Sequence, residues 1–212
     1  MQCNLELFRN LIKNCYPDSA EKVIKILNSL DERLQYACYY HDAYKQSKKE
    51  DWYIGSRANI VAFMQNLHSM HDTLGHLIYY IMDFKLNERE INLYNVLNKI
   101  DKNQHETLKN LLTTLREHSD FKYLNDYVNY SKHRHIVVPI FNFGIPNKQE
   151  FGFHFDAFCK DNTDYPRKKV DDFLSDEFNR EFELVKQIEN ELIAILEKRL
   201  SSIQKNKSTI GY

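Results

Sequence analysis

Glycine and proline are scarce in this 212-residue chain, which contains only 5 Gly and 4 Pro. Such a low content of turn-forming residues excludes a loop-rich, collagen-like or disordered chain. Long apolar runs are also missing. The longest, "LIYYIM" and "IVVPIF", are far shorter than the roughly 20 residues that a membrane-spanning helix needs. The start, "MQCNLELFRN", lacks the basic-then-apolar layout of a secretory signal. We therefore expect no membrane partner.

Cysteine is also scarce, and the net charge is small. The four cysteines (Cys3, Cys15, Cys38 and Cys159) form no C-x-x-C pair and have no zinc-type spacing. We interpret most of them as small core residues of a reduced, cytoplasmic protein. Lys+Arg 29 against Asp+Glu 30 leaves a net charge of −1, so no overall field draws the chain to nucleic acid. Any contact with RNA must come from a local cluster.

Helical patterning dominates what the chain does contain. Apolar residues recur at spacings of three and four in segments bounded by Pro17, polar linkers and capping residues. The clearest segment is 56–84, whose seam alternates these spacings: Ile60, Met64, Leu67, His71, Leu74, Ile78 and Ile81. The other predicted helices are 5–16, 18–47, 87–100, 103–118, one capped by Ser119-Asp120, and 170–203.

The period changes after His135. "HIVVPIFNF" and "EFGFHFDAF" are β-branched or aromatic, and "GIPNKQ" between them holds turn-forming residues. This pattern predicts an antiparallel β-hairpin over about 136–158, in which residues near 136–143 pair with residues near 150–158 and Pro139 marks an edge position. We expect an all-α fold over a single domain, 1–212: a helical bundle with a small inserted β-hairpin near a long C-terminal helix.

The central helix carries a polar stripe beside its apolar seam. Gln65, His68, Asp72 and His76 stand at spacings of three, four and four, so they share one face. His and Asp at such spacings can converge on a metal ion, although one straight helix seldom supplies three ligands. Gly75, in the same segment, lets another backbone or side chain approach closely. A metal site on this stripe is one interpretation.

Asp72 also predicts a partner. A carboxylate beside a core seam needs a cation or a hydrogen-bond donor, because burying it unpaired costs several kcal/mol. The best source of positive charge in the chain is "NYSKHRH", residues 129–135. We therefore predict that Asp72 pairs with Lys132, His133 or Arg134.

Residues 129–135 place an amide, an ammonium, two imidazoles and a guanidinium near a helix C-terminus. The helix dipole favours cations there, so Lys132 and Arg134 are explained without any chemistry as residues that cap the last carbonyls. RNA cleavage is the other interpretation. An imidazole can take a proton from a ribose hydroxyl, a guanidinium can stabilise charge on the phosphate, and an amide can fix the substrate. That chemistry needs no metal, so we predict no cofactor.

The chain resembles the HEPN superfamily of small bacterial helical bundles over roughly residues 56–200. The resemblance depends on "DTLGH" in one helix, "YVNYSKHR" at the end of another, a hairpin and a long final helix. Many HEPN proteins are metal-independent endoribonucleases of toxin–antitoxin and phage-defence systems, with an Arg-x(4–6)-His motif that pairs across a dimer. Asn129 and His133 match this pattern, whereas Val128 stands at the arginine position and Arg134 follows the histidine.

The resemblance implies an RNA-directed protein, expected to be an endoribonuclease, that forms a homodimer and has an antitoxin or a neighbouring-gene protein as partner. It assigns roles to six residues: His133 as acid/base, Arg134 and Lys132 on phosphate, Asn129 as orienting amide, and Asp72 and His68 as support.

Two alternatives remain open. The first is a non-catalytic HEPN-like module that binds a nucleotide, RNA or a protein. The second is a metal-binding bundle that uses His68, Asp72 and His76. A basic rim that could hold phosphates, or be a solvated surface, is predicted from the following residues: Lys122, His135, Lys160, Arg167, Lys168 and Lys169.

Overall fold

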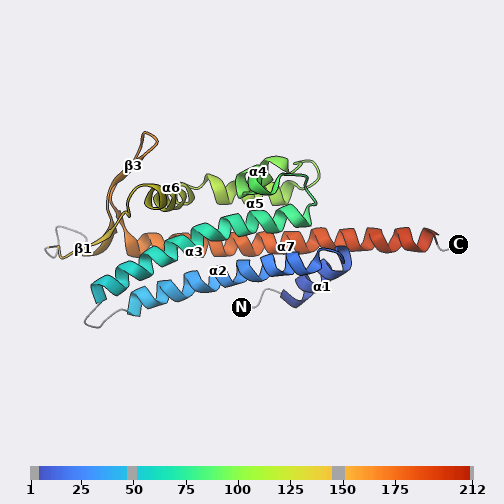
Figure 1. Cartoon of the computed structure of the whole chain (residues 1–212), viewed down its shortest axis with the longest axis horizontal. Helices are drawn as coiled ribbons and strands as arrows, with labels where there is room; N and C mark the ends of the chain where they lie inside the picture. The colour runs from blue at the N-terminus through green and yellow to red at the C-terminus, as the bar shows by residue number, and fades with distance from the viewer. Residues whose placement is uncertain (1–4, 47–51, 145–150, 211–212) are drawn as a thin grey trace. The chain divides into compact units, whose positions relative to one another are not determined.

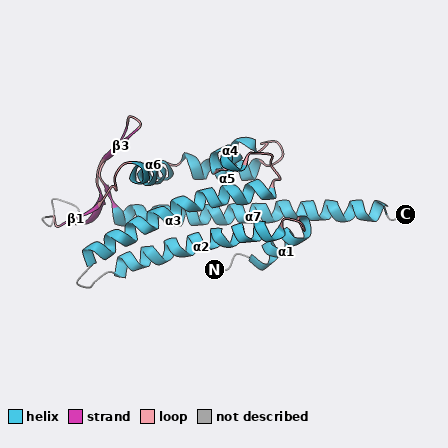
Figure 2. Ribbon diagram, in the orientation of Figure 1, coloured by secondary structure: helices cyan, strands magenta, loops and turns pink. Residues whose placement is uncertain are grey.

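The computed structural model describes residues 5–46, 52–144 and 151–210, with side chains up to 206. Figures 1 and 2 show that helices make up most of the chain and that the strands are confined to the segment between α6 and α7. The prediction of an all-α helical bundle with a small antiparallel hairpin is confirmed. The helices are α1 (Leu5–Cys15), α2 (Ala20–Gln46), α3 (Trp52–Ile81), α4 (Leu93–Lys99), α5 (Glu106–Glu117), α6 (Ser119–His133) and α7 (Val170–Ile210), with a short 3-10 helix, η1 (Glu88–Glu90).

The chain divides into two compact units. Unit 1 comprises Met1–Glu32, His71–Thr114 and Glu183–Tyr212, and unit 2 comprises Arg33–Met70 and Leu115–Phe182. Helices α2, α3, α5 and α7 each contribute residues to both units. None of the described helices is both long and apolar enough to cross a membrane.

Unit 1 contains the close approach predicted at Gly75. A Cβ built on Gly75 would lie 2.8 Å from the backbone nitrogen of Leu93 and 3.0 Å from the carbonyl carbon of Asn92. The start of α4 therefore packs directly on the backbone of α3, which confirms the prediction. The single helix predicted over 87–100 is wrong. Asn92 has an extended backbone (φ −152°, ψ 166°), and its side chain caps α4 by accepting a hydrogen bond from the Asn95 amide.

Unit 2 contains the β-sheet. β1 (Pro139–Asn142) pairs antiparallel with β2 (Gly152–Phe155), and Pro139 lies opposite Phe155. The predicted hairpin is therefore confirmed, although its strands are shorter than expected and its turn, 145–150, lies outside the described residues. A third strand, β5 (Lys168–Lys169), pairs with the other edge of β2. It runs directly into α7, which begins at Val170 as predicted and continues past the expected end near 203.

A second hairpin follows the first, and it was not predicted from the sequence. β3 (Phe158–Lys160) pairs antiparallel with β4 (Thr163–Tyr165) through a two-residue turn. Both turn residues, Asp161 and Asn162, have positive φ angles of 50° and 64°. Asp and Asn tolerate this left-handed backbone, and tight hairpin turns require it. The "DN" dipeptide was the local signal.

An aromatic core joins α6 to these strands within unit 2. Tyr127 and Phe155 are fully buried, and their ring centroids lie 4.9 Å apart. Tyr123 contacts Phe155 from the preceding turn of α6 at 5.8 Å. The Tyr127 hydroxyl donates to the carbonyl of Val137 at 2.8 Å, and the Val137 amide donates to the Ser131 hydroxyl at 3.3 Å. These contacts fix the path of the chain immediately after the helix ends.

Candidate functional site

Residues 129–135 occupy the last turn of α6 and the connection that follows it. The helix ends at His133, and Arg134 is the C-cap residue, whose backbone amide donates to the Tyr130 carbonyl at 2.9 Å. Lys132, His133 and Arg134 are all exposed. We call these three residues the α6-end cluster. The predicted position of the motif, at a helix C-terminus beside a strand, is correct.

The α6-end cluster differs from several other cations of unit 2, which are paired with carboxylates. Within the described part of the chain, the side chains of Lys132 and Arg134 form no ion pair and donate to no carbonyl group. By contrast, Lys160 Nζ lies 2.8 Å from an oxygen of Asp126, and Lys168 pairs with Asp120. The geometry therefore does not support the interpretation that the side chains of Lys132 and Arg134 cap the last carbonyls of the helix. Their charges remain available to an external anion.

Asn129 is held by a chain of hydrogen bonds inside unit 2. Its Nδ2 donates to Oδ1 of Asn125, one turn earlier, at 3.1 Å. The same oxygen lies 3.3 Å from Nε2 of His68, an imidazole on α3 that is only 8% exposed. Because the amide oxygen only accepts, this arrangement places the His68 proton on Nε2. The structure thus connects two of the predicted residues, His68 and Asn129, through Asn125, for which no role was predicted.

Asp126 extends the network toward the second hairpin. It accepts a hydrogen bond from Asn125 Nδ2 at 3.1 Å and contacts Lys160 Nζ at 2.8 Å and the Tyr165 hydroxyl. The hydrogen bond to Asp126 raises the pKa of Lys160 above its ordinary value. Burial, followed by the same carboxylate, raises the pKa of Tyr165. The β3–β4 hairpin is therefore anchored to α6 close to Asn129.

Half of the predicted basic rim is neutralised by neighbouring carboxylates. Lys160 and Lys168 are paired as described above, and Lys169 Nζ lies 3.7 Å from Asp172. Within the described chain, Lys122 and Arg167 have no carboxylate partner, and both are exposed. His135 is exposed, and its ring packs edge-on against Tyr130 at 5.1 Å. The rim is thus reduced to Lys122, His135 and Arg167.

The expected role of Asp72 is not supported. Asp72 is exposed rather than buried beside the seam, so the physical reason for expecting a cationic partner is absent. Its neighbour His71 is the buried member of the pair, at 4% exposure. Successive helical residues point about 100° apart, and this turned the carboxylate to solvent. The prediction that Asp72 is buried beside the seam is wrong, and its pairing with residues 132–134 stays a prediction.

Val128 stands where the HEPN pattern has an arginine, and the structure shows where its side chain lies. At 1% exposure, its side chain lies in the core rather than beside His133. An arginine at this position would point into the apolar interior of unit 2. The guanidinium of Arg134, on the exposed side, is the one that lies next to the imidazole in the chain.

One side-chain group in the described chain has metal-ligand spacing: His118, Asp120 and Glu177, with candidate ligand atoms within 4.8 Å of one another. His68, Asp72 and His76 are not such a group. All three ligands already have protein partners, however. His118 caps α6, in place of the predicted Ser119-Asp120, by accepting from the Asp120 amide. Lys168 contacts Asp120, and Arg180 contacts both Glu177 oxygens at 2.7 and 2.6 Å.

The same corner contains two buried carboxyl groups. Burial is the main cause that raises the pKa of Glu177, to about 7, and that of Glu181, to about 8. Arg180 lies closer to Glu177 than to Glu181, from which it is 3.6 Å away. In sequence this stretch, "DEFNREFE", resembles a solvated charged face, so no role was predicted for it.

No family model matches the chain, and neither the curated proteins nor the solved structures include a significant match.

Proposed function

We propose that the α6-end cluster binds the phosphate backbone of RNA. The observation that carries this proposal is the exposure of Lys132, His133 and Arg134 with no carboxylate partner among the described residues, in a unit where Lys160, Lys168 and Arg180 are all paired. The net charge of −1 provides no general attraction to nucleic acid. Binding would therefore be local, and it would weaken with salt as counterion release requires.

Cleavage is the finer part of the proposal. His133 would take the proton of a ribose 2′-hydroxyl, whose oxygen then attacks the adjacent phosphorus, while the bond to the 5′-oxygen breaks and that oxygen takes a proton from water. Arg134 would stabilise the charge that develops on the phosphate oxygens. Lys132 would bind the phosphate, and Asn129, held through Asn125 by His68, would orient the substrate. No metal is needed in this scheme.

RNA binding without cleavage is the second candidate function, and one observation favours it. The imidazole of His133 has no hydrogen-bond partner in the described chain that would fix its tautomer, and catalytic histidines usually have one. The homodimer, the antitoxin or neighbouring-gene partner and the place in a defence system stay predictions from the HEPN resemblance.

Binding is tested with a labelled single-stranded RNA over a range of salt concentrations. Replacing both Lys132 and Arg134 with Gln should reduce the slope of log affinity against log salt by about 1.4, or about 0.7 for each phosphate contact. The matched control is Lys13→Gln with Lys102→Gln, which removes two exposed charges from unit 1. Equal slopes for the two double variants would overturn the proposal.

Cleavage is tested on the same RNA in the presence of a chelator. His133→Ala should reduce the rate by about 10²- to 10⁴-fold and leave RNA affinity largely unchanged, because acid–base catalysis contributes about that much. Cleavage by His133→Ala at the wild-type rate would exclude His133 as the acid/base. A wild type that binds RNA but does not cleave it would select the second candidate.

A further inference from the structure

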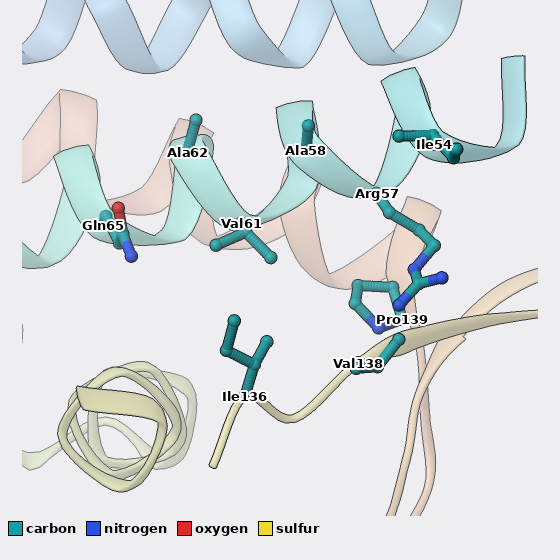
Figure 3. Close-up of a pocket in the computed structure, with 9 residues that line it drawn as sticks. All are labelled: Ile54, Arg57, Ala58, Val61, Ala62, Gln65, Ile136, Val138 and Pro139. Atoms are coloured by element: carbon teal, nitrogen blue, oxygen red, sulfur yellow. The ribbon is translucent and has the colours of Figure 1, made fainter. Parts of the chain in front are cut away.

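A groove in unit 2, separate from the α6-end cluster, lies between α3 and the segment 136–139. Its volume is about 470 Å³, within the range of small-molecule sites. Figure 3 shows the side chains of α3 on one side and those of the extended segment on the other. The apolar lining consists mainly of Ile54, Ala58, Val61, Ala62, Ile136 and Val138.

The lining leaves large aliphatic groups in water. Ile54 is 69% exposed and Ile136 is 57% exposed. On α3 the lining residues recur at spacings of three and four, so they form one continuous stripe along the helix. Covering such aliphatic surface gains about 25 cal/mol per Å². An occupant with a saturated hydrocarbon body would therefore be stabilised along the whole groove.

Arg57 gives the groove a charge. Its side chain reaches from α3 toward Val138 and Pro139, as Figure 3 shows. The guanidinium lies over the ring of Tyr53, at 5.2 Å from its centroid, and that ring stacks on Phe153 at 5.8 Å. Within the described chain, Arg57 has no carboxylate partner. The guanidinium is thus held through its face by the Tyr53 ring, and its N–H groups remain available.

The lining also limits which ligand fits. It contains aliphatic side chains, one guanidinium and the Gln65 amide, and no aromatic ring on which a nucleobase would stack. Arg57 and Gln65 are eight residues apart on α3, or about 12 Å along the helix axis. A carboxylate matches the planar fork of an arginine in a bidentate arrangement. The required ligand is therefore an extended aliphatic chain with one acidic end.

We propose that this groove binds a small aliphatic carboxylate, with the carboxylate on Arg57 and the hydrocarbon chain between the α3 stripe and residues Ile136 and Val138. The site does not depend on the RNA function. It shares no residue with the α6-end cluster, so each proposal can fail without the other.

The test is calorimetric titration of the full chain with hexanoate, octanoate and decanoate, each below its micelle concentration. Each additional pair of methylene groups should tighten binding on the order of tenfold, since a buried methylene contributes about 0.8 kcal/mol. Decanol and decylammonium serve as comparison ligands of the same length. Decanoate should bind at least tenfold more tightly than either.

Two matched variants locate the carboxylate. Arg57→Met keeps a long side chain and should remove the preference for decanoate over decanol, whereas Arg89→Met, with the same loss of charge at an exposed position of η1, should keep it. Val61→Asp should weaken both decanoate and decanol. Thermal unfolding of each variant verifies that it folds. The proposal is overturned by equal binding of all three ten-carbon ligands or by an unchanged preference in Arg57→Met. A peptide with a C-terminal isoleucine, which also combines a carboxylate with an aliphatic group, is titrated as well. The proposal is overturned if this peptide binds and the aliphatic carboxylates do not.

Discussion

Asn129 Nδ2 donates a hydrogen bond to Asn125 Oδ1 across one turn of α6, and the two atoms are 3.1 Å apart. The accepting oxygen also receives the Nε2–H of His68, which comes from α3. One amide oxygen therefore serves two donors from different helices. The orientation of Asn129, one turn before His133, depends on this oxygen.

We predict that Asn125→Leu destabilises the chain by about 1–3 kcal/mol, because it removes the acceptor for both Asn129 and the buried His68. The free energy of unfolding in urea measures this loss. Asn110→Leu, at an exposed position of α5, is the matched control and should change stability by less than about 0.5 kcal/mol. Equal stability of the two variants would show that the network makes no contribution.

Val128→Arg would give the chain an arginine at the position it has in the HEPN motif, but we predict that it fails to create a nuclease. The side chain at position 128 is 1% exposed, so the variant buries an unpaired charge and should lose about 3 kcal/mol or more. Val128→Met, which is long but uncharged, separates the cost of volume from the cost of charge. A Val128→Arg protein with wild-type stability and new cleavage of RNA would contradict this prediction.

Two glycines of α3 should respond to alanine in opposite directions. Gly75→Ala places a Cβ 2.8 Å from the Leu93 nitrogen, and this backbone clash should cost about 1–3 kcal/mol, more than the helix propensity gained. A Cβ added at Gly55 would meet nothing within 4 Å. Gly55→Ala should therefore stabilise the chain by about 0.5–1 kcal/mol. Melting temperatures of the two variants on the same side of the wild-type value would refute the comparison.

The buried carboxyl of Glu181 should make stability fall with rising pH. Its pKa is raised to about 8 in the folded chain, against an ordinary value of 4.5. The folded state then holds a proton that the unfolded state has lost. Below about pH 4.5 the Glu181 carboxyl makes its full contribution to the free energy of unfolding. Above that pH the contribution decreases by about 1.4 kcal/mol per pH unit up to the folded pKa. The raised pKa of Glu177 acts in the same direction.

Unfolding in urea between pH 5 and 9 tests this dependence. Glu181→Gln should flatten the decrease, because the amide cannot ionise. Glu197→Gln, at an exposed position of α7, is the control and should keep the wild-type slope. A slope that is identical in all three proteins would remove Glu181 from the explanation.

Much of the fold followed from local patterns in the sequence. The seam of α3 predicted its buried residues, and the change of period after His135 predicted the β1–β2 hairpin. The position of the α6-end cluster at a helix terminus was also predicted from residues close in sequence. These features depend on helical or strand periodicity, which a sequence shows directly.

The candidate site was predicted less well, because its partners are distant in sequence. His68 and Asn125 are separated by 57 residues, and no local pattern indicates their contact. The burial of Asp72 was predicted wrongly for a different reason. A position beside the apolar seam of a helix lies at the boundary between core and solvent, so its burial cannot be read from the spacing. Glu181 was missed for the opposite reason, because it is buried although it lies in a charged stretch of sequence.

The strand β1 has a consequence for how the protein behaves at high concentration. It is an edge strand of its sheet, the surrounding segment "IVVPIFNF" contains no charged residue, and Phe143 is 74% exposed. Uncharged apolar edges of this kind pair with the edges of other molecules and lead to aggregation. Pro139 opposes this, because it removes one backbone donor from a strand of only four residues. We therefore expect a Pro139→Thr variant to aggregate at a lower concentration than the wild type.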